Sequence, residues 1–158
     1  MKRLHLHITV ENLEASIRFY TAMLGIGPTK QKPDYAKWMI EDPRMNLAIS
    51  TRGERSGLDH LGLQVDSLDE LETLRKQMKS ADLSLFDEGE TTCCYANSDK
   101  SWVKDPDGIP WEAYHTMEDA QIFSRNSLSA DASNEENSCC SPSLMSIGAS
   151  GGCDSTKK

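Results

Sequence analysis

The sequence lacks an excess of positive charge, a long apolar run and an apolar leader. Its net charge is -8, whereas nucleic acids and anionic membranes bind basic surfaces, so we expect neither as a partner. No apolar run approaches the roughly 20 residues of a membrane span. The first residues, Met1 to His5, lead directly into alternating sequence without the apolar core of a signal peptide.

The five cysteines do not form the even set of a secreted disulfide scaffold. Three of them, Cys139, Cys140 and Cys153, lie in a polar C-terminal stretch. We therefore expect free thiols and a reducing cytoplasm as the compartment. The length of 158 residues suits one domain with a real core and is too short for two ordinary ones.

The composition changes near residue 120 and divides the chain into a body and a tail. From Ser124 onwards Ser, Asn, Gly and Asp dominate without any period, and such a segment buries too little apolar surface to offset its ordering entropy. We predict a body over residues 1–117 and a disordered tail over 118–158, which begins with a short helix around Glu118–Phe123.

The body contains an internal repeat. His5 is followed by Val10 and Leu13 at the same distances as His60 is followed by Val65 and Leu68. Each opening alternates like a strand and then changes to helical spacing, with Asn12 and Ser67 as helix caps and Gly25 as the stop of the first helix. The first helix carries an apolar stripe of Leu13, Ile17, Tyr20 and Leu24, and the second carries Leu68, Leu71, Leu74, Arg75 and Met78.

Strand-like runs follow each helix and complete an α+β fold of two tandem β-α-β-β-β modules. We place module one at about residues 1–54 and module two at about 55–117. The expected strands after the helices are Tyr35–Ile40 and Met45–Ser50 in module one, and Thr91–Ala96, Ser101–Lys104 and Pro110–His115 in module two.

The repeat predicts an enclosed metal site. His5 and His60 hold equivalent places on the first strands, and Glu112 lies on the last strand, facing away from Trp111 and Ala113. Two imidazoles and one carboxylate suit Fe(II), and also Mn(II), Co(II), Ni(II) or Zn(II), and leave coordination positions open. In module one we expect Leu47 to occupy the place of Glu112, which leaves the fourth corner without a protein ligand.

Two further histidines are assigned to ordinary structural roles. His7 shares the face of His5 and is its rival as a ligand, but Gly62 stands at the corresponding place in module two. His115 has no partner in the pattern either. A lone histidine on a strand is usually a surface residue or a satisfied one.

The adjacent pair Cys93 and Cys94 offers two soft thiolates at one place, which suit a thiophilic element. The alternatives are two small apolar residues that fill a strand, or a strained disulfide. Neighbours on a regular strand point to opposite faces, so two cysteines that grip one atom require a loop or bulge. We expect a mobile segment around residues 87–98 that closes over the metal.

These residues together resemble the vicinal oxygen chelate superfamily of glyoxalases, fosfomycin-resistance proteins and extradiol dioxygenases. The resemblance covers residues 3–115 and implies a metal held by His5, His60 and Glu112. Within the superfamily, Leu58–Gly62, Thr92–Ala96, Asp99–Val103 and Pro110–Glu112 are similar to the CadI group, which includes the ArsI-type carbon–arsenic lyases, and the Cys139–Cys140 pair resembles one in their tails.

The resemblance implies a nonhaem Fe(II)-dependent dioxygenase that cleaves the C–As bond of methyl or aromatic trivalent organoarsenicals and releases arsenite, in arsenic resistance. Cys93 and Cys94 would bind the arsenic, O2 would be the co-substrate, and no obligate protein partner is implied. One alternative is a protein that sequesters cadmium or arsenite without turnover. Another is a different superfamily reaction, such as glutathione transfer or isomerisation, which leaves the cysteine pair unexplained.

Overall fold

The computed structural model describes residues 1–120 of the chain. A strand, a helix and three strands follow one another and then repeat once, which confirms the predicted pair of β-α-β-β-β modules. The elements are β1 (Arg3–Thr9), α1 (Leu13–Leu24), β2 (Lys30–Lys32), β3 (Tyr35–Glu41) and β4 (Arg44–Ser50), then β5 (Gly57–Val65), α2 (Leu68–Ser80), β6 (Phe86–Cys93), β7 (Ala96–Lys104) and β8 (Pro110–Asp119).

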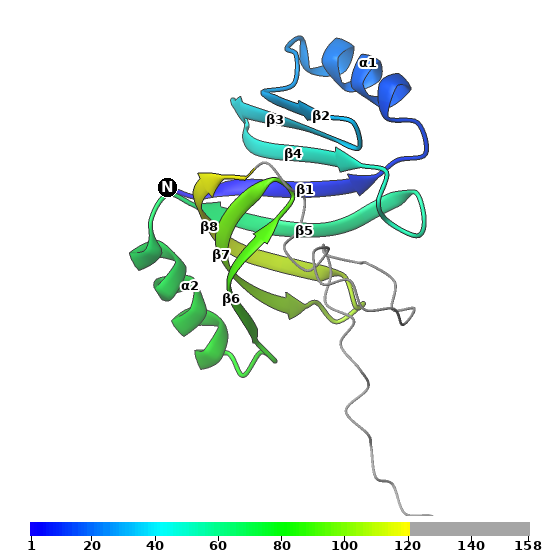
Figure 1. The fold of residues 1–158 in the computed structure, drawn as a ribbon. Helices are drawn as coiled ribbons and strands as arrows, with labels where there is room; N and C mark the ends of the chain where they lie inside the picture. The colour runs from blue at the N-terminus through cyan, green and yellow to red at the C-terminus, as the bar shows by residue number, and fades with distance from the viewer. Residues whose placement is uncertain (121–158) are drawn as a thin grey trace, which may run out of the picture.

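The strands form one curled sheet in the order β2-β3-β4-β1-β5-β8-β7-β6. The first strands of the modules, β1 and β5, pair antiparallel at its centre. Each also pairs in parallel with the last strand of its own module, β4 or β8. Helix α1 lies outside the sheet against the first module, and α2 against the second (Figure 1). The sheet therefore brings the predicted metal-binding strands together at the junction of the modules.

Both helices begin, and α1 ends, where the sequence predicts. The side chain of Asn12 accepts a hydrogen bond from the backbone N–H of Ala15 at 2.9 Å, and that of Ser67 accepts one from the backbone N–H of Glu70. Gly25 ends α1 with a φ of 70°, in the left-handed region that glycine adopts without strain.

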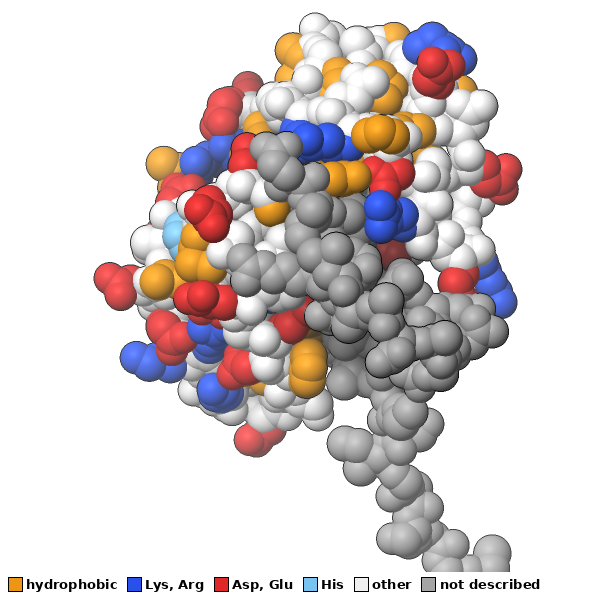
Figure 2. Space-filling model, viewed as in Figure 1, with side chains coloured by type: hydrophobic (Ala, Val, Ile, Leu, Met, Phe, Trp, Pro, Cys, Tyr) orange, Lys and Arg blue, Asp and Glu red, His pale blue; other side chains and the backbone are white. Residues whose placement is uncertain are grey.

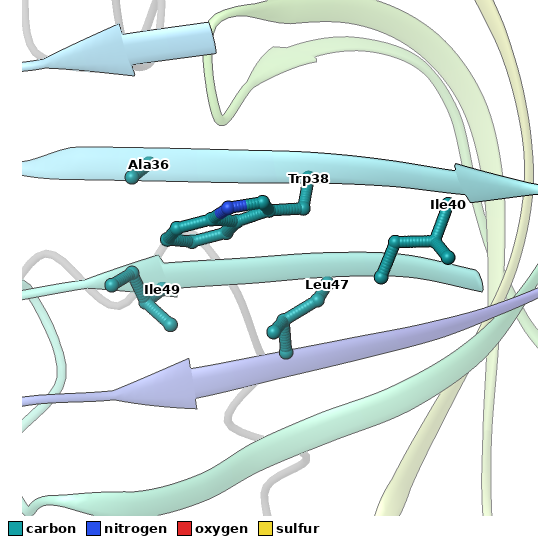
Figure 3. Packing of buried hydrophobic residues seen from close by; sticks show 5 residues of the cluster. All are labelled: Ala36, Trp38, Ile40, Leu47 and Ile49. Atoms are coloured by element: carbon teal, nitrogen blue, oxygen red, sulfur yellow. The ribbon is translucent and has the colours of Figure 1, made fainter. Parts of the chain in front are cut away.

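The two faces of the sheet differ in chemistry. The outer face of β3 and β4 carries the buried apolar cluster in Figure 3, made of Ala36, Trp38, Ile40, Leu47 and Ile49. Leu6 and Ile8 of β1 and the predicted stripe of α1 pack against it. The inner face of β1 instead carries His5 and His7, which are both buried. Alternation along each strand thus separates an apolar core from a polar interior.

The region around the cysteine pair differs from the predicted strands. The expected strand Thr91–Ala96 is interrupted, because Cys94 and Tyr95 form the turn between β6 and β7, and β7 runs from Ala96 rather than from Ser101. Strand β2 has no counterpart in the prediction. Strand β8 continues to Asp119, so the helix predicted from Glu118 is wrong at its first two residues. The rest of that segment and the predicted tail lie outside the described residues.

The surface of the described part carries charge of both signs. Acidic and basic side chains are interspersed over residues 1–120 on the face in Figure 2. Neither α1 nor α2 has the length and apolar character that a bilayer crossing needs.

Candidate metal and thiol site

The inner face places two of the predicted ligands against each other. His5 lies opposite Gly62, and His7 lies opposite His60 in the β1–β5 pairing. The Nε2 atoms of His5 and His60 are 3.1 Å apart, and both rings are almost completely buried.

The second ring nitrogens fix which atoms are left for a ligand. The Nδ1–H of His5 donates to the carbonyl oxygen of Asn46 at 3.1 Å, and the Nδ1–H of His60 donates to the carboxylate of Asp59 at 2.6 Å. Because a carbonyl and a carboxylate only accept, each ring in its neutral form carries its lone pair on Nε2. Histidines that bind metals are held in this way by their second nitrogen.

The electrostatics of the two rings differ. Burial, helped by the neighbouring His60, lowers the pKa of His5 to about 3. Burial also acts to lower the pKa of His60, but the hydrogen bond with Asp59 and the negative charge of Glu112 outweigh it and hold that pKa above its ordinary value. Of the two rings, His60 is therefore the one that binds a proton more readily.

Glu112 completes the predicted set. It lies on β8 beside Gly62, and its Oε2 is 3.7 Å from the Nε2 of His5 and 3.7 Å from that of His60. Burial would raise its pKa, but Lys100 and His60 prevail and hold the pKa of Glu112 well below its ordinary value. Glu112 is thus a buried anion at neutral pH.

The donor set fits a divalent cation. Two donors about 2.1 Å from a metal lie about 3.0 Å apart at right angles and about 3.4 Å apart at the tetrahedral angle. The separations of 3.1 and 3.7 Å are close to those values. Two nitrogen lone pairs and a carboxylate that converge in a buried space are suitable ligands for a cation between them.

Gly62 makes the approach of Glu112 possible. A Cβ at this position would lie 2.6 Å from the carbonyl oxygen of Glu112 and 3.2 Å from its Cβ. Any side chain there would push β8 away. The absence of a second histidine at the place of His7 in module two therefore has a steric reason.

The expected counterpart of Glu112 in module one is wrong by one residue. Glu112 pairs with Gly62, which is the counterpart of His7, and His7 pairs with Ala48. Ala48 rather than Leu47 therefore occupies the corresponding place, whereas Leu47 belongs to the outer apolar cluster. A shift of one residue moves a side chain to the other face of a sheet. The side chain of Ala48 cannot bind a metal, which agrees with the expectation that no protein ligand lies at this fourth corner of the site.

The cysteine pair leaves regular strand geometry, as predicted. Cys93 ends β6, and Cys94 and Tyr95 have φ values of 53° and 59°, as in the tight turns that join two hairpin strands. The two Sγ atoms are 3.4 Å apart, far beyond the roughly 2.05 Å of a disulfide. The two sulfurs therefore lie on one side and are not joined by a disulfide in this structure. Cys93 is also buried in a cluster with Tyr35 and Tyr95, so the interpretation that it fills apolar space at the end of β6 stays open. The expected mobility of residues 87–98 stays a prediction, and most of them form paired strand.

One cleft connects the thiols with the histidines. It is lined by residues from both modules, and the space left between their side chains is about 30 Å³, roughly enough for a water molecule or an ion. Its lining includes His5, His7, Tyr35, Lys37, Asn46, His60, Cys93, Cys94, Lys100, Glu112 and Tyr114.

Two residues of the cleft were not predicted as site residues. The ammonium of Lys100 lies 2.6 Å from Oε1 of Glu112 and is buried with it. Burial would lower the pKa of Lys100, but Glu112 holds it well above its ordinary value. His7 is 1% exposed rather than a surface residue, and one donor atom from each of His5, His7 and His60 lies within 4.8 Å of the others. The alternation of side chains along the first strand predicted that His7 lies on this face. That it lies opposite His60 follows from the pairing register of β1 and β5, which only the structure shows.

The other histidine and the three cysteines near the C-terminus are not among the described residues that line this cleft. His115 lies away from the cleft, with its Nδ1 3.2 Å from the carbonyl oxygen of Val65. Cys139, Cys140 and Cys153 lie outside the described residues.

Comparison with known proteins agrees with this architecture. Residues 2–113 match the model of the glyoxalase/bleomycin resistance protein/dioxygenase superfamily. The chain belongs to this superfamily. Among solved structures, homoprotocatechuate 2,3-dioxygenase from Arthrobacter globiformis matches with a TM-score of 0.54 and 20% sequence identity. The match covers 78% of this chain and 38% of that enzyme. This likeness shows the fold alone.

Two relatives within the superfamily are much closer in sequence. A trivalent organoarsenical cleaving enzyme from Bacillus sp. (strain MD1) is 39% identical over 92% of the chain and 94% of its own length. The cadmium-induced protein CadI of Mycobacterium bovis is 36% identical over 96% of the chain and its own full length, 100%. These similarities extend through both modules and into the segment after β8.

Proposed function

We propose that this protein is an Fe(II)- and O2-dependent carbon–arsenic lyase that acts on trivalent organoarsenicals, methyl or aromatic, and releases arsenite. The observation that carries the proposal is the Cys93–Cys94 thiol pair, with its sulfurs 3.4 Å apart, in the same cleft as His5, His60 and Glu112. The relative named a trivalent organoarsenical cleaving enzyme supports the choice of substrate. The role is arsenic resistance in the reducing cytoplasm, where both thiols stay reduced.

The thiol pair binds the substrate by ligand exchange. A trivalent arsenical with one organic group has two exchangeable hydroxyls, and condensation with the thiols of Cys93 and Cys94 releases two waters and forms two As–S bonds. Inorganic arsenite has three exchangeable groups, so two thiols satisfy it less completely. The pair therefore favours substrate over product. Closure of residues 87–98 would bring the arsenic towards the metal.

His5, His60 and Glu112 hold the metal, which is Fe(II) for catalysis although Mn(II), Co(II), Ni(II) or Zn(II) fit the same donors. When bound, Fe(II) supplies O2 activation. Lys100 fixes one oxygen of Glu112 at 2.6 Å, so the other remains directed at the histidines. For the methyl substrate, one methylarsenite and one O2 balance to one formaldehyde and one arsenous acid, with the carbon oxidised and both oxygen atoms of O2 reduced.

The test is anaerobic loading of the full chain with Fe(II), followed by methylarsenite with and without air. We expect arsenite and formaldehyde in equal amounts only when both iron and air are present. Cys93→Ser and Cys94→Ser should abolish this release and leave the Fe(II) content unchanged. Release without O2, or by both serine variants, would refute the proposal.

Sequestration without turnover is the second candidate, because a relative is named for its induction by cadmium and two thiols in one cleft suit a soft ion. Its signature is stoichiometric binding of arsenite or Cd(II) with no arsenite released from methylarsenite. A third outcome is catalytic turnover by a variant that lacks both thiols. It would point to another reaction of the superfamily.

A further inference from the structure

His7 lies beside the predicted metal ligands, in the same cleft as the thiol pair. Its ring centroid is 4.9 Å from that of His60 and 6.4 Å from that of His5. On the other side it faces Tyr35 at 6.2 Å, and Tyr35 packs in one cluster with Cys93. No role in the proposed reaction uses this buried imidazole.

The two nitrogens of His7 have unequal surroundings. Its Nε2 lies 2.9 Å from the hydroxyl oxygen of Ser50, which is itself buried. Its Nδ1 is buried and has no hydrogen-bond partner within residues 1–120. A buried polar nitrogen without a partner is destabilising, and a bound ligand would satisfy it. If Nε2–H donates to Ser50, the lone pair is on Nδ1, and the ring is held by its second nitrogen as metal-binding histidines are.

The internal repeat explains why there is room for this ring. In module two, Gly62 leaves space for Glu112 on the neighbouring strand. In module one the arrangement is reversed, because Ala48 on β4 has only a methyl group and His7 on β1 is its lateral neighbour. The donor at this corner therefore comes from the first strand of the module instead of the last.

We propose that His7 is a fourth metal ligand, bound through Nδ1, so that three imidazoles and one carboxylate hold the metal. The proposal rests on the metal site of the proposed function. Donors on opposite sides of a metal lie about 4.2 Å apart if each bond is about 2.1 Å, and one ring nitrogen of each of the three histidines lies within 4.8 Å of those of the other two. With His7 the chain would supply four donors instead of three and leave fewer positions open, and His7 is the donor beside Tyr35, which packs with Cys93.

Cobalt tests the ligand count without any turnover. Each imidazole bound to Co(II) places one exchangeable N–H close to the paramagnetic ion, where its proton resonance is strongly shifted. We expect three such resonances in the full chain loaded with Co(II), two in His7→Gln and three in the control His115→Gln. The Co(II) dissociation constant should rise by about 100-fold in His7→Gln, as for the loss of important metal-site groups, and stay unchanged in His115→Gln.

Each outcome decides between defined possibilities. Two shifted resonances in the unmodified chain would overturn the role of His7 and leave the proposed function intact. No shifted resonance would overturn the metal site itself and both proposals with it. Because the count in the unmodified chain needs no variant, a misfolded His7→Gln protein would not obscure the answer.

Discussion

The Nε2 atoms of His5 and His60 lie 3.1 Å apart although the residues are 55 positions apart in the chain. Each ring is oriented by a different acceptor, a backbone carbonyl for His5 and a carboxylate for His60. The contact exists because β1 and β5 pair at the junction of the modules. The site thus depends on correct pairing of two duplicated units, which leads to several predictions.

Gly62→Ala should lower metal affinity. The added methyl would meet the carbonyl oxygen of Glu112 at 2.6 Å, so β8 must shift and carry Glu112 away from the histidines. We expect a loss of about 1–3 kcal/mol in the free energy of unfolding, typical of overpacking, and weaker Co(II) binding by titration. Gly27→Ala is the matched control, because nothing lies within 4 Å of its Cβ. Equal Co(II) affinity in both variants would contradict the steric role of Gly62.

Lys100→Met should destabilise the metal-free protein more than the metal-bound one. Without Lys100, the buried carboxylate of Glu112 loses the ammonium 2.6 Å away, and breaking a buried ion pair costs about 3–5 kcal/mol. A bound divalent metal compensates part of the lost charge. Urea unfolding with and without Co(II) measures the difference.

The double variant Lys100→Met/Glu112→Gln provides the control for this ion pair. It should recover part of the stability lost in Lys100→Met, because no buried charge is left alone. Additive losses would show that the two side chains do not interact.

Cys94→Asn should stabilise the fold and abolish arsenical binding. Cys94 has a φ of 53°, a conformation that asparagine adopts more readily than cysteine. We expect a gain of up to about 1 kcal/mol in the free energy of unfolding, together with loss of stoichiometric phenylarsenite binding. Cys93→Ser should lose the binding without the gain, because Cys93 lies in β6 before the turn. Tight phenylarsenite binding by Cys94→Asn would disprove the two-thiol site.

Acidification should destabilise the metal-free protein. Burial lowers the pKa of His5 and of His7 to about 3. At a pH between this value and the ordinary histidine pKa, the unfolded chain therefore binds protons that the native state does not. Stability from these neutral rings is complete above about pH 6.5 and falls as the pH decreases, by about 2 kcal/mol per histidine at pH 5. The raised pKa of His60 acts in the opposite direction and reduces the net effect.

Urea unfolding at about pH 7.5 and about pH 5 measures this dependence on acid. His7→Asn should show a smaller loss of stability between the two conditions than the unmodified chain. A stability that rises on acidification would mean that His60 dominates the titration.

Local signals in the sequence predicted the fold well. Asn12 and Ser67 cap their helices because capping depends on a few neighbouring residues, and the repeat predicted the module order. The turn at Cys94 and Tyr95 was not placed, because neither residue is the Gly or Asn that usually marks such a turn. Leu47 was assigned the place of Ala48, because pairing register between strands is set by tertiary contacts and not by local pattern.

The site was predicted in part for the same reason. His5, His60 and Glu112 were singled out by the repeat and by alternation, and the fold brings them together. Lys100 carried no signal of its own, since a lysine on a strand is ordinarily exposed. Its burial follows from the pairing of β7 with β8, which sets Lys100 beside Tyr114.

The seam between β1 and β5 has a consequence for how the chain can be divided. Each module contributes one side of the cleft, and the 51–56 connection between β4 and β5 is a surface loop between their ends. Two polypeptides cut in this loop would each lack part of the donor set, so neither should retain metal by itself. Mixing them should restore Co(II) binding through fragment complementation, with the metal as the cross-link that joins the halves.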